Sequence, residues 1–492
     1  MSRSLLRSAA LVAAGLACGT ALTVSVSAFA EKSRTISLPA EDIRLFADVF
    51  GAIKSYYVDD ISDKKLLENA VRGMVEGLDP HSSFLDAKAF EDMEESTAGE
   101  FGGLGIEVTK DPSGVRVMTP IDDTPAARAG VLAGDLIIKI DDKATADLSL
   151  NENVKLMRGK PGTSIVLTIA RKGVTKPVVM KLTRAVIKVQ SVKSKPLADG
   201  LGYIRISQFQ ERTGDDVAVA VEKLASENHL KGLVLDLRNN PGGLLNAAIG
   251  VSAAFLPENS LVVSTRGRNA QNERRFYAAK RDYAVASTTT DHIEKLTAAA
   301  KTVPIVVLVN PASASASEIV AGALQDHHRA TIMGTRSFGK GSVQTILPLR
   351  VKGDETTGVK ITTARYYTPS GRTIQAKGIT PDIAVDDTPD GNYPSFNLRE
   401  ADLAHHITVK DDGKNKKKAS DVTTDDEVVE DDIEPAKVPS LRYQFGDEKD
   451  FPLAQAVAHL TGKTVVTHAD VQKKLKAEKE KAKAEADKTT SK

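Results

Sequence analysis

Short apolar runs alternate with helical patterns through the middle of the chain, from about residue 188 to residue 383. Four of these runs have the length and composition of strands, namely residues 201–206, 232–237, 305–309 and 331–333. After the third run, apolar residues recur at helical spacing at Ile319, Val320, Ala323 and Leu324. Strands that alternate with helices predict an α/β core for this region.

Residues 39–95 carry a different pattern, in which apolar residues repeat at helical intervals. One face holds Ile43, Phe46, Ala47, Val49, Phe50 and Ile53, and a second holds Leu66, Leu67, Ala70, Val71, Met74 and Val75. Apolar faces of this kind need a partner, so we expect them to be buried against each other or against another chain.

The chain changes character after about residue 397. Residues 410–437 are dense in Asp, Glu and Lys, which predicts a disordered linker. Residues 441–460 regain apolar positions and are expected to dock as a small helical element. Residues 473–492 are almost entirely Lys, Ala, Glu and Asp, which predicts a solvated helix or disorder.

The N-terminus has the features of a secretory signal. Arg3 and Arg7 precede a run of small apolar residues from 9 to 26, and Ala-Phe-Ala at 28–30 supplies a cleavage pattern. We therefore expect a signal peptide over residues 1–30 and export to the periplasm or cell envelope. The run is also long enough to span a bilayer, so a retained membrane anchor is the alternative. The single cysteine, Cys18, lies inside it.

Composition limits the classes of function. With 492 residues, of which 41% are apolar, the chain can form two or three domains with proper cores. The net charge is only +1 and there is no tryptophan, which argues against nucleic acid as a partner. The nine histidines form no cluster with ligand-like spacing, and no metal or other cofactor is expected.

The strand at 305–309 ends in a turn that holds Ser313, Ser315 and Ser317. A strand that enters a helix through such a turn can present a hydroxyl beside free backbone N–H groups, as several hydrolases do with their nucleophile. The alternative is structural. Ser315 and Glu318 have the spacing of a capping box, in which the serine only satisfies the helix N-terminus.

Lys340 lies in a second motif, Phe338-Gly-Lys-Gly341. The spacing from Gly334 to Lys340 is that of a phosphate-binding loop, but Gly341 stands where that loop needs Ser or Thr. Residues 342–349 also alternate like a strand, so we reject nucleotide binding. A lysine between glycines can lose its water, and desolvation lowers its pKa towards the range of a general base. An ordinary solvated lysine is the alternative.

The strand at 232–237 ends in a third motif, Asn239-Asn-Pro-Gly-Gly243. Paired glycines at the carboxyl end of a strand leave backbone N–H groups free to point at a ligand, as an oxyanion hole requires. A plain turn is the alternative.

Together these motifs resemble one family, the carboxyl-terminal processing peptidases, also called tail-specific proteases. The resemblance rests on Ser313-Ala-Ser-Ala-Ser-Glu-Ile319, on Phe338-Gly-Lys-Gly341 with Gln344, and on Leu235-Asp-Leu-Arg-Asn239 with Pro241-Gly-Gly243. It implies that Ser315 is the nucleophile, that Lys340 is the general base and that Gln344 orients the base. It also implies oxyanion donors at the N–H of Ala316 and at Gly242 or Gly243.

Residues 101–184 resemble a PDZ domain of the bacterial type. The segments that carry this resemblance are Gly102-Gly-Leu-Gly-Ile106, Ala127-x-Ala-Gly-Val131 and Gly134-Asp-Leu-Ile-Ile-Lys-Ile140. A PDZ domain binds an extended peptide as an added strand and holds its free carboxylate on loop amides. The expected carboxylate loop is Leu104, Gly105 and Ile106. Arg158 is interpreted as part of a turn, with a regulatory contact as the alternative.

The resemblance implies a multidomain α/β protein with a ClpP/crotonase-like catalytic core, an inserted β-rich PDZ domain and a helical N-terminal region. After the signal peptide, the expected parts are a helical region (35–98), the PDZ domain (99–185), a Ser-Lys peptidase core (186–396), a charged linker (397–437) and a C-terminal element with a Lys/Glu-rich tail (438–492).

The implied function is that of an exported serine endopeptidase that recognises C-terminal tails and processes or degrades envelope proteins. Its expected partners are protein or peptide substrates with exposed C-termini. A homo-oligomer and an adaptor or activator protein are further partners that the sequence leaves open. Two other functions compete: a PDZ adaptor with an inactive core, and a CoA enzyme of the crotonase type, which would give no reason for a PDZ domain.

Three histidines are assigned structural roles. His327 and His328 lie late in a predicted helix, where they suit its C-terminal dipole. His81, in Asp79-Pro-His-Ser-Ser83, is interpreted as turn chemistry, with a functional role as the alternative.

Overall fold

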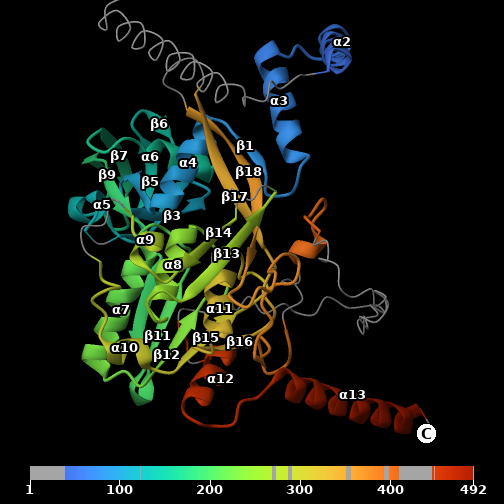
Figure 1. Ribbon diagram of the computed structural model, residues 1–492. Helices are drawn as coiled ribbons and strands as arrows, with labels where there is room; N and C mark the ends of the chain where they lie inside the picture. Colours follow the sequence, from blue (N-terminus) through green and yellow to red (C-terminus); the bar gives the residue numbers. More distant parts are fainter. Residues whose placement is uncertain are drawn as a thin grey trace, which may run out of the picture. The chain divides into compact units, whose positions relative to one another are not determined.

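The computed structural model (Figure 1) describes residues 39–121, 123–268, 273–285, 291–350, 356–392, 398–408, 446–447 and 449–490. The expected signal peptide and residues 409–437 of the expected linker lie outside these ranges. The chain forms two compact units, Met1–Val71 and Arg72–Lys492. In the first, α2 (Ala40–Tyr56) has no buried residue. The apolar face predicted there is exposed, by 36–50% at Ile43, Phe46, Val49 and Ile53.

A six-stranded sheet with the order β10-β11-β12-β15-β16-β19 forms the centre of the second unit. The strands are β10 (Val192–Pro196), β11 (Leu201–Ile206), β12 (Gly232–Asp236), β15 (Ile305–Val309), β16 (Thr331–Gly334) and β19 (Ile383–Ala384). β10 is antiparallel to β11, and the other strands run parallel. The four predicted strands are confirmed, and the structure places them next to one another as β11, β12, β15 and β16. Because parallel strands end at one edge, the loops after β12, β15 and β16 meet there.

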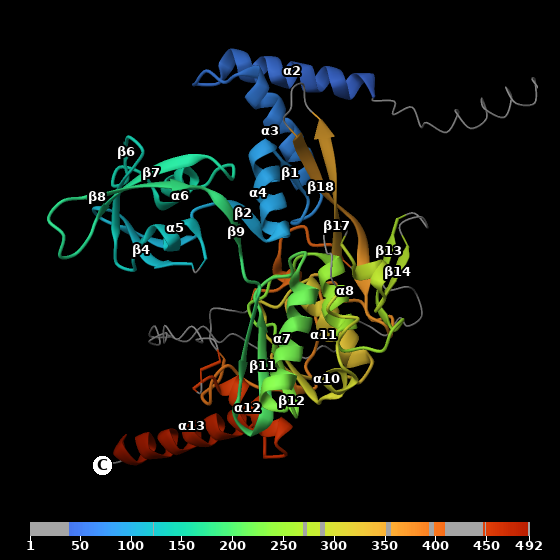
Figure 2. The ribbon, with the colours of Figure 1, turned by 90° about the vertical axis from the view of Figure 1, so that its left-hand side faces the viewer.

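Both faces of this sheet are covered, which explains the continuous aliphatic runs. Leu233, Leu235 and Val307 face a core shared with α7 (Thr213–Asn228), α8 (Leu245–Ala253) and α11 (Ala316–Asp326). These helices can be followed beside the strands in Figure 2. Val234 and Val306 face a second core, which is closed by α12 (Phe451–Leu460).

A second sheet has the order β1-β18-β13-β14, and β17 pairs with β18. Its strands are β1 (Ser83–Leu85), β13 (Leu261–Gly267), β14 (Arg274–Tyr277), β17 (Ser342–Arg350) and β18 (Thr356–Tyr367). Gln344 on β17 lies opposite Thr362 on β18. On the other side of β18, Ser83 lies opposite Lys360. The segment before β1 is thereby brought beside β18, the strand that pairs with β17.

The region predicted to be a β-rich unit contains a sheet with the order β3-β4-β5-β7-β8, to which β6 adds by pairing with β5. Its elements are β3 (Ile106–Asp111), β4 (Gly114–Pro120), β5 (Leu136–Ile140), β6 (Lys143–Ala144), β7 (Ser164–Ala170), β8 (Val178–Thr183), α5 (Pro125–Ala129) and α6 (Leu150–Met157). β2 (Glu100–Gly103) pairs with β9 (Ala185–Lys188). Val115, Ile137 and Leu167 are fully buried in a core of its own.

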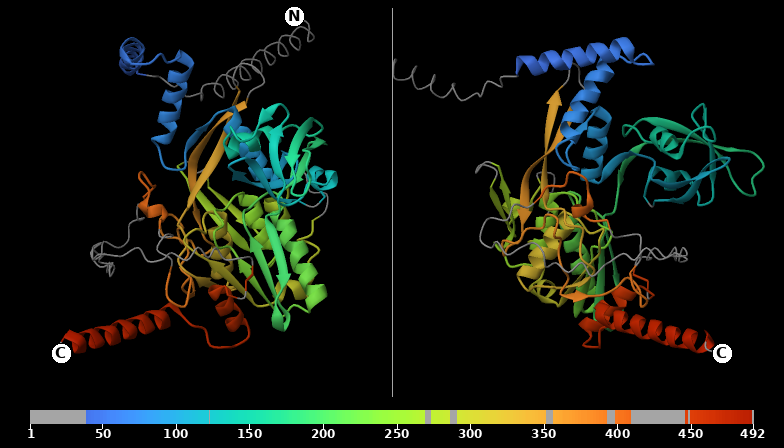
Figure 3. Two further views of the ribbon diagram at one scale, coloured as in Figure 1. Left: turned by 180° about the vertical axis from the view of Figure 1, so that it is seen from behind. Right: turned by 90° about the vertical axis from the view of Figure 1, so that its right-hand side faces the viewer.

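The remaining elements are α3 (Asp63–Glu76), α4 (Ala87–Ala98), α9 (Lys280–Tyr283), α10 (Ala298–Thr302), α13 (His468–Thr490) and the short 3-10 turns at Ala198–Gly200 and Glu400–Asp402. The helical element predicted for residues 441–460 corresponds to α12, and the predicted tail is helical through Thr490 (Figure 3). Within the described ranges, no helix combines the length and apolar character needed to cross a membrane.

Candidate active site

Ser315 lies between β15 and α11, at the edge of the sheet where the three loops meet. Its backbone has φ 54° and ψ −111°, a conformation that costs a non-glycine residue free energy and is held only by its surroundings. The N–H of Ser315 donates to Glu318 Oε2 at 2.8 Å, and its carbonyl accepts from the N–H groups of Glu318 and Ile319. The predicted capping box is therefore present, and it fixes the turn.

The three serine hydroxyls of the turn have different surroundings. Ser313 Oγ donates to the carbonyl of Leu237 at 2.8 Å, and Ser317 Oγ donates to the carbonyl of Asn240 at 2.9 Å. Both serines are fully buried. Ser315 is partly exposed. Its side chain meets the Glu318 N–H in a capping box, but within the described residues its hydroxyl donates to no acceptor. Geometry thus leaves Ser315 as the hydroxyl that can react.

The glycine motif after β12 is bound to the serine turn by a set of hydrogen bonds. Asn239 and Asn310 form a reciprocal pair: the Asn239 N–H donates to the Asn310 side chain, and Asn310 Nδ2 donates to Asn239 Oδ1 at 2.8 Å. The carbonyl of Asn240 accepts from Ala314 N–H. These contacts fix the distance between the two loops.

Two backbone N–H groups are free beside Ser315. The N–H of Gly242 donates to Asn240 Oδ1 at 2.9 Å, whereas Gly243 N–H and Ala316 N–H have no acceptor among the described residues. Gly242 itself must be glycine. Its φ is 102°, and an added Cβ would lie 2.8 Å from Ser315 Cβ and 3.0 Å from Ala316 N. Of the two predicted glycine donors, the geometry therefore favours Gly243.

Lys340 is joined to Ser315 through the fully buried carboxylate of Glu318. Glu318 Oε2 accepts from the Lys340 N–H at 2.9 Å, and Oε1 accepts from Ser337 Oγ at 2.6 Å and Gly339 N–H at 2.7 Å. Burial raises the pKa of Glu318 to about 7, even though these hydrogen bonds favour its ionised form.

The amine of Lys340 lies in a largely dehydrated position. Burial lowers its pKa below the ordinary lysine value, and the positive charge of Lys360 adds to this shift. Glu400, Glu318 and Asp79 act in the opposite direction. Desolvation is the largest of these effects, so the site shifts Lys340 towards its neutral form.

The structure gives Gln344 partners other than Lys340. Its Nε2 donates to Ser342 Oγ at 3.0 Å and to Thr362 Oγ1 at 3.1 Å. In the described part of the chain, no hydrogen bond joins the side chains of Ser315, Lys340 and Gln344 to one another. Ser315 and Lys340 thus lie in loops at the edge of the central sheet and Gln344 lies on β17, with no hydrogen bond between their side chains in this conformation.

Around Lys340 the structure adds residues that the sequence did not assign to the site. Asp79 Oδ1 accepts from Thr362 Oγ1 at 3.0 Å, which continues the chain of hydrogen bonds from Gln344. His81 Nε2 lies 2.7 Å from Glu400 Oε2. Burial alone would raise the pKa of Glu400, but hydrogen bonds from His81 and Gln375 hold it below its ordinary value. His81 therefore has a tertiary role beyond the predicted turn.

The expected carboxylate loop lines a groove of about 140 Å³. The groove is formed by Phe101, Gly103, Leu104, Gly105, Ile106, Val108, Val154, Met157 and Arg158. The N–H groups of Leu104 and Gly105 have no backbone partner among the described residues. Apolar walls and free amides at one end suit an apolar C-terminal side chain and its carboxylate.

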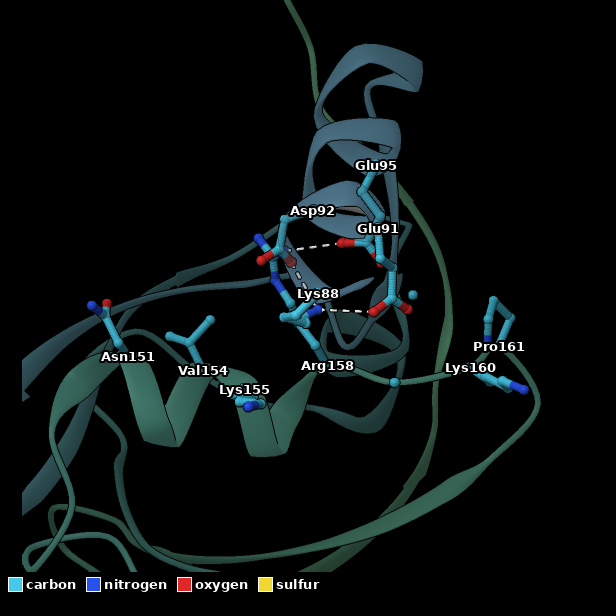
Figure 4. A pocket seen from close by; sticks show the side chains of 12 residues that line it. Lys88, Glu91, Asp92, Glu95, Asn151, Val154, Lys155, Arg158, Lys160 and Pro161 are labelled. Atoms are coloured by element: carbon cyan, nitrogen blue, oxygen red, sulfur yellow. Dashed lines mark hydrogen bonds and ion pairs between the residues drawn. The ribbon is translucent and has the colours of Figure 1, made fainter. Parts of the chain in front are cut away.

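Arg158 ends α6, as the turn interpretation predicts, but it also contacts α4. Its Nη1 lies 3.1 Å from Glu95 Oε2, and its guanidinium stacks 4.5 Å from the Phe101 ring. Arg158 and Glu95 border a cleft of about 760 Å³ (Figure 4). Acidic side chains of α4 line one wall and basic side chains near α6 line the other, namely Glu91, Asp92 and Glu95, and Lys155, Arg158 and Lys160.

No cluster of His, Cys, Asp and Glu suited to a metal ion occurs within the described ranges.

Three family profiles match successive parts of this chain. The sequence profile of peptidase family S41 matches residues 200–385, and that of the PDZ domain matches residues 102–182. A third profile, the activating protease CtpB N-terminal domain, matches residues 12–89.

Individual relatives extend over most of the chain. A carboxy-terminal-processing protease of Bartonella bacilliformis is 52% identical over 370 residues, which cover 74% of this chain and 80% of that protein. The carboxy-terminal processing protease CtpA of Bacillus subtilis is 33% identical over 335 residues, covering 68% and 67%. A solved photosystem II D1 C-terminal processing protease has 31% sequence identity and a TM-score of 0.38, covering 71% of this chain and 94% of that chain.

Proposed function

Since the chain belongs to peptidase family S41, as a carboxy-terminal processing protease with a PDZ domain, we propose that it cleaves peptide bonds with Ser315 as nucleophile and Lys340 as general base. One observation carries this proposal. The buried carboxylate of Glu318 binds the backbone N–H of Ser315 and that of Lys340, so one group sets the positions of both.

In the proposed reaction, the neutral amine of Lys340 takes the proton of Ser315 Oγ as the oxygen attacks the substrate carbonyl. The N–H groups of Ala316 and Gly243 hold the oxyanion. The tetrahedral intermediate then collapses as the lysine ammonium protonates the leaving amine. Water, deprotonated by the same lysine, releases the acyl group and restores Ser315.

Gln344 completes the proposed site. Its Nε2 is held by Ser342 and Thr362, so its Oε1 is the atom that can accept a hydrogen bond from Lys340 and aim the amine. Because Lys340 and Ser315 are not hydrogen-bonded to each other in this conformation, the mechanism requires them to close by a small movement when substrate binds.

The PDZ domain binds peptide C-termini, and we propose that it delivers such tails to this site. The apolar groove at Leu104–Ile106 would take the last side chain and the carboxylate. The proposed setting is the periplasm or cell envelope, on the strength of the signal pattern at residues 1–30. Sequencing the N-terminus of the protein from an envelope fraction tests export. A start at Glu31 supports it, and a cytosolic chain starting at Met1 contradicts it.

A cleavage assay on an unfolded protein with an apolar C-terminus tests the proposed chemistry. Ser315→Ala and Lys340→Ala are expected to lower kcat by at least about 10³-fold. Ser226→Ala and Lys377→Ala change exposed residues and serve as matched controls with unchanged rates. Cleavage at the wild-type rate by either site variant would contradict the assignment. The inactive adaptor is not proposed, because no observation favours it.

A further inference from the structure

The C-terminal part of the chain reaches the loop that follows β12 through one buried ion pair. Arg238 Nη1 donates to Asp450 Oδ1 at 2.8 Å, and Nη2 donates to Asp450 Oδ2 at 2.5 Å. Only 3% of Arg238 and 1% of Asp450 are exposed. The pair joins positions 212 residues apart, and Asp450 lies outside the matched peptidase segment, residues 200–385.

Arg238 stands immediately before the Asn239–Gly243 loop, which carries the proposed oxyanion donor Gly243. On one side, this loop is fixed by Asn310 and by the serine turn. On the other side, the guanidinium of Arg238 lies between two carboxylates. Asp236, also fully buried, accepts from Arg238 Nε at 3.0 Å and from Nη2 at 2.6 Å.

The geometry of this contact fixes orientation as well as charge. A planar guanidinium bound by two nitrogens to one carboxylate has little rotational freedom. Burial would lower the pKa of Arg238, but Asp236 and Asp450 hold it well above its usual value, so the guanidinium stays charged. Without Asp450, one edge of a buried cation would lose its partner.

Asp450 is itself held firmly. Its Oδ1 accepts from the Leu453 N–H at 3.3 Å, which caps the start of α12. Leu453 and Ala456 of α12 are packed in the core on the sheet face that holds Val234 and Val306. The carboxylate is therefore presented to Arg238 by a helix that is docked on β12 and its neighbour.

We propose that Asp450 is a positioning residue of the peptidase: through Arg238 it fixes the loop that places Gly243 N–H at the reacting carbonyl. The helix α12, which lies beyond the segment that the family profile covers, then contributes to catalysis by holding Asp450 in place. This inference rests on the proposed function, because it assigns the loop an oxyanion-binding role.

Asp450→Asn in the full chain tests the inference, since asparagine keeps the size and the helix cap but removes the charge. Asp470→Asn is the matched control. Asp470 is exposed and accepts from Thr467 N–H at the start of α13, away from Arg238. Active sites are first counted with a fluorophosphonate, and kcat is then expressed per titrated site. Hydrogen exchange of residues 237–244 is measured in parallel and needs no activity.

We expect Asp450→Asn to lower kcat per titrated site by about 10-fold, because a lost oxyanion donor costs roughly 10²–10³-fold and a misplaced one costs less. KM should stay within about twofold, and exchange in residues 237–244 should accelerate. Asp470→Asn should match the wild type in all three. A purely structural role would reduce the number of titratable sites and leave kcat per site unchanged, which would overturn the inference.

If Asp450→Asn does not fold, Asp450→Glu provides the same test. Its carboxylate still reaches Arg238 but is displaced by one methylene, so kcat per titrated site should again fall. Wild-type kcat per site in this variant would overturn the inference. A wild-type chain that cleaves no substrate would instead overturn the proposed function, and the inference with it.

Discussion

The backbone N–H of Lys340 donates to the carboxylate of Glu318 at 2.9 Å, and this carboxylate also receives the N–H of Ser315 at 2.8 Å. The sequence motif suggested that Glu318 caps a helix. In the fold it performs that role and also ties the loop of the proposed base to the turn of the proposed nucleophile. Its effect on the site is therefore larger than that of an ordinary cap.

Glu318→Gln tests this relationship. An amide can accept at one oxygen only, so two of the four donors would face an NH₂ group. We expect kcat to fall by about 10–100-fold and the free energy of unfolding to fall by about 2–3 kcal/mol, because hydrogen bonds to a buried charged group are lost. Kinetics and chemical denaturation measure the two effects. Glu227→Gln, at an exposed position of α7, is the control. A wild-type kcat in Glu318→Gln would contradict the role.

The pKa of Glu318 also predicts a pH effect on stability. Its folded-state pKa is about 7, above the ordinary 4.5 of an unfolded glutamate. Between these values the folded state binds more protons, so ionisation of Glu318 lowers the free energy of unfolding by its full amount above about pH 7 and by progressively less as the pH falls towards 4.5. The free energy of unfolding of the wild type, relative to Glu318→Gln, should therefore rise on acidification through this window. A pH-independent difference would contradict the raised pKa.

Lys340→Met should separate stability from activity. Because burial lowers the pKa of Lys340, the folded state binds fewer protons than the unfolded state between its two pKa values, and stability rises with pH there. Below that window, burial of the charged amine lowers the free energy of unfolding, and methionine removes this charge. We expect no cleavage and a Tm about 2–4 °C above the wild type at pH 7, which corresponds to ~1 kcal/mol. A Tm below the wild type would contradict the desolvated lysine.

Gly242→Ala should abolish activity for a steric reason. The new Cβ would lie 2.8 Å from both Ser315 Cβ and the carbonyl oxygen of Ala314. Gly371→Ala is the control, because its φ of 83° is equally unfavourable for alanine but nothing lies within 4 Å of the new Cβ. The control should lose about 1–2 kcal/mol of stability and no activity. Activity in Gly242→Ala equal to that of the control would argue against this close approach.

The PDZ groove should distinguish a free C-terminus from an amidated one. Loop amides at Leu104 and Gly105 can bind a carboxylate, and a hydrogen bond to a charged group contributes about 1.5–3 kcal/mol. A fluorescent peptide with an apolar last residue should therefore bind at least about 10-fold more tightly as the free acid than as the amide. Gly105→Ala should remove the preference, since its Cβ would lie 2.4 Å from Thr124 Cβ. Equal binding of acid and amide would show that the loop amides do not bind the terminal carboxylate of the peptide.

Much of the fold could be predicted because its signals are local. The aliphatic runs at β12 and β15 and the helical spacing in α11 follow from burial on both sheet faces and on one helix face. The three motifs around Ser315, Lys340 and Gly243 are local too, and parallel strands bring their loops together.

The rest depends on partners that are distant in sequence. Ser313 and Ser317 are excluded as nucleophiles by bonds to Leu237 and Asn240, 76 and 77 residues away. The sequence around His81 predicts a turn residue, whereas the fold places His81 against Glu400, which lies 319 residues later. No spacing rule in a single sequence identifies such pairs, and the same holds for Arg238 and Asp450.

In the proposed mechanism, Ser315 is the nucleophile and Lys340 activates it. The most direct measurement is reaction with a fluorophosphonate across pH, followed by mass spectrometric mapping of the modified peptide. We expect a single adduct on Ser315, formed faster as the pH rises through the lowered pKa of Lys340, lost in Lys340→Met and retained in Ser313→Ala. An adduct on Ser313 or Ser317, or labelling of Ser315 that is unchanged in Lys340→Met, would contradict it.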